Sequence, residues 1–212
     1  MRSQFFLSAL VASTATAHFT LDYPTVRGFD EDKLVGYPCG GFDTPSTTRT
    51  SYPISGGRIA LTMGHIDANV QVFLGLGNDV GSAFNYALTP VYSEQGLGDF
   101  CITTLTIPEG VNVTEGTNAT IQVITNGDPD GGLYNCADIT FSSSAPEPAA
   151  SVCTNGTGVQ STIATTTTQP NGTTTSDTPA SSSTTAAASS ANANTYSAGL
   201  LVGAGALLAA LL

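Results

Sequence analysis

The most restrictive feature of this chain is a series of short β-type segments between residues 57 and 141. These segments are rich in β-branched and aromatic residues, and Gly, Asn, Asp and Pro separate them, as in GDPDGG at 127–132. No window combines helical periodicity with helix start and stop signals. The pattern predicts an all-β domain, an antiparallel β-sandwich of immunoglobulin or fibronectin type. Strands are expected at 57–63, 68–77, 85–92, 100–107, 119–125 and 133–141.

The first 17 residues have the composition of a secretory signal. Arg2 precedes an apolar run, and the small residues Ala-Thr-Ala end at Ala17. Cleavage after Ala17 would make His18 the first residue of the mature protein.

The last residues have the composition of a second processing signal. Residues 191–212 end in an uninterrupted apolar tail that follows small polar residues, which predicts a glycolipid (GPI) attachment signal that is removed. Ser189 and Asn192 are the candidate residues for attachment of the glycolipid. A short C-terminal membrane anchor is the alternative. The protein is then expected on the outer face of the plasma membrane.

Residues 18–153 form the expected domain, and residues 154–190 form a different kind of segment. This segment is dominated by Ser, Thr, Ala and Pro, which cannot bury enough apolar surface to fold, so we expect a disordered, O-glycosylated stalk. Such a stalk would lift the domain into a cell wall. Glycosylation motifs, consistent with secretion, lie at Asn112, Asn118, Asn155 and Asn171.

The charge of the chain excludes one class of partner. After removal of residues 1–17, four basic side chains oppose 16 acidic ones, a difference of −12. Binding to nucleic acid or to anionic lipid requires clustered Lys and Arg, so neither is expected.

All four cysteines lie in the expected domain. In an oxidising compartment they should form two disulfides, for which three pairings are possible. We favour Cys39–Cys136 with Cys101–Cys153, although the sequence does not decide among the pairings.

The two histidines indicate a metal site. An N-terminal His18 would offer its α-amine and its imidazole Nδ1 to one ion, and His65, in a turn where Gly64 permits a sharp bend, is the candidate for a second imidazole. This histidine brace of three nitrogens favours tetragonal Cu(II) over tetrahedral zinc. One copper per chain is expected, and acid should weaken its binding because the α-amine must lose a proton.

A carboxylate could complete this ligand set. Alternation in residues 133–141 places Leu133, Ala137 and Ile139 on one face, which looks like core, and Asp138 on the other. Asp138 is therefore a candidate ligand, with an ordinary exposed strand carboxylate as the alternative. Asp67, two residues after His65, competes for the same role.

Taken together, several segments resemble the fungal LPMO-like copper-binding family, which includes GPI-anchored copper-acquisition factors. They are HFTLDYP (18–24), GYPCGG (36–41), MGHIDANVQVFLGLG (63–77), GDFCI (98–102) and YNCADITF (134–141). The resemblance implies an immunoglobulin-like sandwich that binds one copper ion through a brace, with His18, His65 and Asp138 at the matching ligand positions.

Three functions remain open at this point. We favour a monomeric, non-enzymatic surface protein that captures extracellular Cu(II) and passes it to a membrane importer. The alternatives are a lytic polysaccharide monooxygenase and a structural cell-wall protein. A carboxylate ligand would hinder the copper reduction that a monooxygenase needs, and the chain has no Trp for gripping a flat polymer. The structural hypothesis leaves both histidines unexplained.

Overall fold

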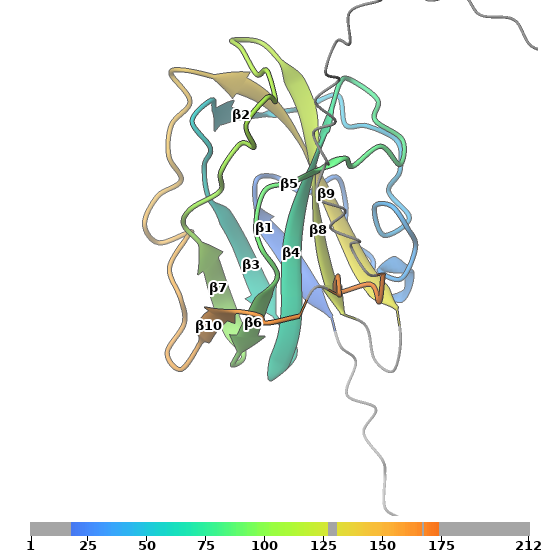
Figure 1. Ribbon diagram of the computed structural model, residues 1–212, viewed down its shortest axis with the longest axis vertical. Coiled ribbons are helices and arrows are strands. Elements are labelled where there is room, and N and C mark those ends of the chain that lie inside the picture. Colours follow the sequence, from blue (N-terminus) through green and yellow to red (C-terminus); the bar gives the residue numbers. More distant parts are fainter. Residues whose placement is uncertain (1–17, 127–130, 167, 174–212) are drawn as a thin grey trace, which may run out of the picture. The chain divides into compact units, whose positions relative to one another are not determined.

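The computed structural model describes residues 18–126, 131–166 and 168–173 (Figure 1). The predicted all-β class is confirmed, because the described residues contain strands and one short 3-10 helix at Glu31–Lys33. None of their helices is long and apolar enough to cross a membrane. The strands are β1 (Phe19–Tyr23), β2 (Thr50–Pro53), β3 (Ile59–Met63), β4 (Asp67–Leu76), β5 (Tyr86–Ala87), β6 (Tyr92–Gln95), β7 (Gly98–Ile102), β8 (Asn118–Asn126), β9 (Gly132–Ser142) and β10 (Gln160–Ile163).

Two sheets form the sandwich. The smaller sheet has the order β1-β3-β7, and the larger has the order β10-β6-β4-β8-β9-β2, with β5 paired to β4. The strand pairs are antiparallel as predicted, except that β2 runs parallel to β9, from Thr50 opposite Ile139 to Pro53 opposite Ser142. Pro53 is accommodated because β2 lies at the edge of its sheet, where a missing N–H donor is tolerated.

The core lies between the two sheets and uses alternate residues of their strands. The smaller sheet contributes Phe19, Leu21, Leu61, Met63 and Phe100, and the larger contributes Val70, Val72, Leu74, Ile121, Val123, Ala137, Ile139 and Phe141. This period-two selection from both sheets is the arrangement that the sequence predicts for a sandwich.

Strand β9 is buried on both faces. Its odd-numbered residues, including Ala137 and Ile139, belong to the core as predicted. Its other face is covered by residues 24–50, here called the cover segment, in which Cys39 is joined to Cys136 and the Arg27 side chain reaches Asp138. The same segment also pairs with the edge of β9, where the amide of Arg27 donates to the carbonyl of Cys136 and the amide of Tyr134 donates to the carbonyl of Leu34, both at 2.8 Å. A carboxylate on this second face is therefore not exposed.

Both favoured disulfides are present. Cys39–Cys136 fastens the cover segment to β9, and Cys101–Cys153 fastens β7 to the segment that precedes β10.

The folded domain extends past the predicted boundary at residue 153. Strand β10 pairs with β6, from Gln160 opposite Gln95 to Ile163 opposite Tyr92, and Val159 joins the core. The beginning of the predicted stalk is therefore part of the domain. The predicted signal at 1–17, the stalk from residue 174 and the attachment signal with Ser189 and Asn192 lie outside the described residues.

The four predicted glycosylation sites differ in their surroundings. Asn112 and Asn155 are exposed, whereas Asn118 and Asn171 are partly buried. The Asn118 side-chain amide donates to Asn78 Oδ1 at 2.6 Å, and Asn155 Oδ1 accepts from the amide of Cys101 at 2.8 Å. Glycosylation of these residues stays a prediction.

One carboxylate points into the core. Glu94 in β6 pairs with Ala68 in β4 and is fully buried. Neither of its carboxyl oxygens has a hydrogen-bond partner in the part of the chain that the structure describes. Burial, with a smaller contribution from the charge of Asp67, raises the pKa of Glu94 to about 7.

Glu94 should make the fold less stable as pH rises. Between an ordinary pKa of 4.5 and the folded value of about 7, the native state holds a proton that the unfolded state has released, so stability falls across this window. The full shift corresponds to about 3 kcal/mol. Glu94→Gln mimics the protonated acid and should remove this decline, so urea unfolding should find the variant more stable at pH 8 and similar at pH 4.5. An unchanged pH profile would contradict the assignment.

Candidate metal centre

The pairing of β1 with β3 brings the two histidines to the same end of the sandwich. Phe19 lies opposite Met63, so His18 and Gly64, the next residues outward, face each other. The amide of Gly64 donates to the carbonyl oxygen of His18 at 2.9 Å. His65 follows directly, at the start of the turn into β4.

Gly64 allows this close approach because it lacks a side chain. A β-carbon there would lie 2.7 Å from the carbonyl oxygen of His18 and 3.1 Å from its Nε2. The imidazole of His18 thus packs against the backbone that carries His65. The sequence predicts a bend at Gly64, and the structure gives a further reason for glycine, which is the space that His18 occupies.

His65 has an unsatisfied polar atom. Its Nε2 is buried and has no hydrogen-bond partner among the residues that the structure describes. A buried polar atom left without a partner costs about 1–3 kcal/mol. A metal bond to the neutral imidazole would satisfy this nitrogen, so the chemistry of the two histidines fits a copper ion.

His18 has an acidic neighbour that the sequence analysis did not identify. Its Nδ1 lies 3.0 Å from Oε1 of Glu31, and the two side chains are 37% and 47% exposed. Glu31 begins the 3-10 helix of the cover segment, whose N-cap is Asp30. Since Glu31 lies 13 positions after His18, between the acidic residues Asp30 and Asp32, no local spacing could have indicated the contact.

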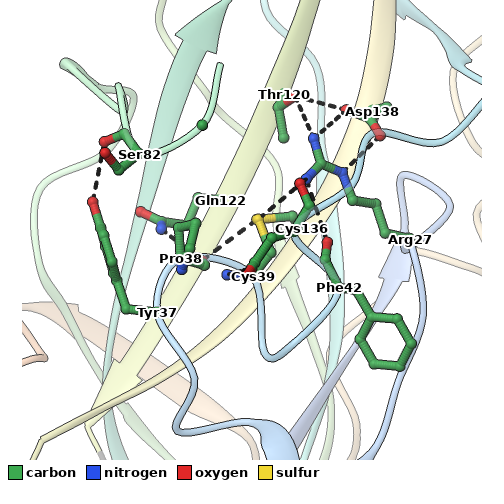
Figure 2. The surroundings of a disulfide bond; sticks show 12 residues. Arg27, Tyr37, Pro38, Cys39, Phe42, Ser82, Thr120, Gln122, Cys136 and Asp138 are labelled. Atoms are coloured by element: carbon green, nitrogen blue, oxygen red, sulfur yellow. Dashed lines mark hydrogen bonds and ion pairs between the residues drawn. A yellow bond between two sulfur atoms is a disulfide. The ribbon is translucent and has the colours of Figure 1, made fainter. Parts of the chain in front are cut away.

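Asp138 has a different set of partners (Figure 2). Its carboxylate is fully buried and accepts hydrogen bonds from Arg27 Nε at 2.7 Å and Arg27 Nη2 at 2.8 Å. The Thr120 hydroxyl at 2.6 Å and the Ser46 amide at 2.7 Å also donate to it, and Arg49 Nη1 lies 3.7 Å from Oδ1 as a second ion-pair partner. Burial alone would raise the pKa of Asp138, but these hydrogen bonds, chiefly that from Arg27, hold it below its usual value.

The predicted ligands are therefore not assembled as one group. The structure places His18 beside Gly64, the residue that precedes His65. Asp138 instead forms an ion pair with Arg27. Within residues 18–126, 131–166 and 168–173, no three His, Cys, Asp or Glu side chains are grouped to hold a metal ion. Asp67 is exposed, and a hollow of about 360 Å³ beside it is lined by Gly64, His65, Ile66, Asp67 and Leu97.

Comparison with known proteins extends the resemblance seen in the sequence. The model of the BIM1-like copper acquisition factor domain matches residues 16–158. Copper acquisition factor BIM1 of Cryptococcus neoformans var. grubii is 31% identical over 158 residues, which cover 70% of this chain and 71% of that protein. A lytic polysaccharide monooxygenase-like protein of Emericella nidulans is 35% identical over 203 residues, which cover 76% of this chain and 82% of that protein.

A third relative is more similar in sequence and longer. An uncharacterised protein of Aspergillus fumigatus is 47% identical over 153 residues, which cover 70% of this chain and 63% of that relative's length. The family model covers most of the folded domain, including both histidines and all four cysteines. The chain belongs to the BIM1-like copper acquisition factor family.

Proposed function

We propose that this protein binds extracellular Cu(II) at the cell surface and presents it for uptake, with His18 and His65 as the nitrogen ligands. The observation that carries the proposal is the pairing of His18 with Gly64, which sets the imidazole of His18 against the backbone next to the unsatisfied Nε2 of His65. The α-amine of His18, released by cleavage after Ala17, would be the third nitrogen. Copper is the cargo of this site.

Family membership supports the copper part of this proposal. Relatives carry the names copper acquisition factor and lytic polysaccharide monooxygenase-like protein. The second name keeps an oxidative activity on cell-wall glycans as the competing function. Attachment through a C-terminal glycolipid, delivery to an importer and a monomeric state belong to the proposal as its cellular setting.

The proposal is tested with the secreted protein, after mass spectrometry has verified that it begins at His18. With one equivalent of Cu(II), electron paramagnetic resonance should show a tetragonal signal coupled to three nitrogens. A protein whose α-amine at His18 is acetylated should lose this signal, because the terminal nitrogen becomes an amide and no other amine is added. An identical signal from the acetylated protein would refute the site.

A second assay separates capture from catalysis. The copper-loaded protein, supplied with peroxide, should release no oxidised oligosaccharides from chitin or β-glucan. Oxidised products that disappear when the α-amine of His18 is acetylated would establish the monooxygenase function instead.

A further inference from the structure

The end of the sandwich that carries both histidines also carries an exposed apolar surface. Ile66 and Leu97, here called the apolar tip, are 67% and 59% exposed, although most large apolar side chains of the domain are buried. The amide of Gly96 donates to the carbonyl of Ile66 at 2.7 Å, which holds the turn after β3 beside the turn between β6 and β7. Both residues of the apolar tip line the hollow of about 360 Å³ that also contains His65.

The last described residues lie at the same end of the domain (Figure 1). Asn171 packs against Gly132, where an added β-carbon would lie 2.8 Å from that of Asn171. Gly132 pairs with Asn126 across β9 and β8, and Asn126 Oδ1 accepts from the amide of Asn69 near the start of β4 at 2.6 Å. Because His65 lies just before β4, the described chain ends on the side of the domain that carries the candidate metal centre.

This position limits the distance between the histidines and a membrane anchor. The pairing of β10 with β6, and the 2.8 Å hydrogen bond from the amide of Ala164 to the carbonyl of Val91, hold the chain to the domain well past residue 154. Residues 174–188 then remain before Ser189, the first predicted attachment residue. A chain of this length spans at most about 55 Å, so attachment there would keep the histidine end within that distance of the membrane surface.

A short tether changes what a small surface can bind. Two exposed side chains cover far less than the about 1,200–2,000 Å² that specific, stable protein interfaces bury. A partner in the same membrane, however, is held at an effective concentration in the millimolar range by a short flexible linker. At such a concentration a weak contact is sufficient, so the apolar tip suits a partner that lies in the anchoring membrane.

The charges near the apolar tip favour a protein over the lipid surface. Asp67 lines the hollow and is exposed, and Glu31, which is 47% exposed, contacts His18. These carboxylates would be repelled by anionic lipid. A protein surface with an apolar centre and a border of Lys or Arg would instead be complementary to them.

We propose that Ile66 and Leu97 form the docking surface for a membrane protein that accepts copper from the neighbouring histidines. The inference rests on the proposed function and adds the surface through which the ion is handed over. The tether holds the histidine end near the membrane, and the apolar tip sets the orientation of the two proteins during transfer.

The test uses cells that display the full chain and take up copper from a copper-limited medium. Intracellular copper is measured by mass spectrometry and expressed per displayed molecule. Leu97→Asp should lower the rate of uptake at least about tenfold, because a carboxylate in the centre of an interface removes its main apolar contact. Ile163→Asp is the matched control, because Ile163 is 66% exposed on β10, and it should stay within about twofold of the wild type. Leu97→Met, which stays apolar, should also retain uptake.

The outcomes separate this inference from the function on which it rests. Purified Leu97→Asp should keep the Cu(II) affinity and resonance signal of the wild type. Wild-type uptake by this variant would overturn the docking surface, and so would a loss of its copper affinity, which would place Leu97 in the metal site. Binding of the wild type to vesicles of neutral phosphatidylcholine, abolished by Leu97→Asp, would assign the surface to lipid instead. If the wild type fails the acetylation test, or if cells without the chain take up copper equally fast, the proposed function itself is wrong.

Discussion

Asp138→Asn is expected to lower the free energy of unfolding by about 3–5 kcal/mol at pH 7, measured by urea titration of the metal-free protein. The substitution keeps the size of the side chain but leaves the guanidinium of Arg27, which is only 3% exposed, without its counter-charge. Removing one partner of a buried ion pair typically has this cost because the other charge stays buried. A loss below about 1 kcal/mol would contradict this role for the pair.

A double variant provides the control for this prediction. Arg27→Met with Asp138→Leu removes both charges together, so it should cost less than the sum of the two single changes. The pH dependence has a defined sign. Because the folded pKa of Asp138 lies below its usual value of 3.8, its contribution to stability is present above that pH and is lost as the pH falls through the folded pKa.

His65→Ala is expected to weaken Cu(II) binding by more than about 100-fold, and His18→Ala to do the same. Even partners that only support a metal ligand cost 10- to 100-fold when removed, so loss of a ligand should cost more. Affinity would be measured by competition with a Cu(II) chelator. Asp67→Asn is the matched control, because Asp67 lies two residues from His65. The same change also tests Asp67 as the alternative to Asp138 for the carboxylate ligand.

The His65→Ala variant has a second readout that needs no copper. Since Nε2 of His65 is buried without a hydrogen-bond partner among the described residues, His65→Ala should leave the metal-free protein about as stable as the wild type. A large loss of stability together with unchanged copper affinity would make His65 a structural residue.

The strands with strong alternation could be predicted from the sequence, and the weaker ones could not. Strands β3, β4, β8 and β9 lie close to their expected ranges because their core-facing residues repeat every second position. The run at 85–92 contains Pro90 and forms only β5 and the first residue of β6. The run at 100–107 ends as a strand at Ile102. Strands β2 and β10 have only four residues each, too few to show a period. Strand β1 is as long as β3 and alternates at Phe19 and Leu21, but the prediction omitted it.

The two histidines are conspicuous in the sequence because a predicted cleavage point precedes His18 and because His is rare, and their role as ligands stays a prediction. The surroundings of Asp138 could not be predicted. Alternation distinguishes the two faces of β9 but does not show that residues 24–50 cover the second face. Arg27 lies 111 positions before Asp138, and such a pairing leaves no local pattern. The contact of Glu31 with His18 was undetectable for the same reason.

The docking of the cover segment on β9 has a consequence for the time course of synthesis. Arg27, Leu34 and Cys39 contact a strand that the ribosome makes roughly a hundred residues later. At about 5–20 residues per second, the neighbourhood of His18 stays without its final packing for roughly 5–20 seconds after it emerges. A peptidase that cleaved the nascent chain after Ala17, as the sequence predicts, would meet an open segment, and the finished domain would then close around His18.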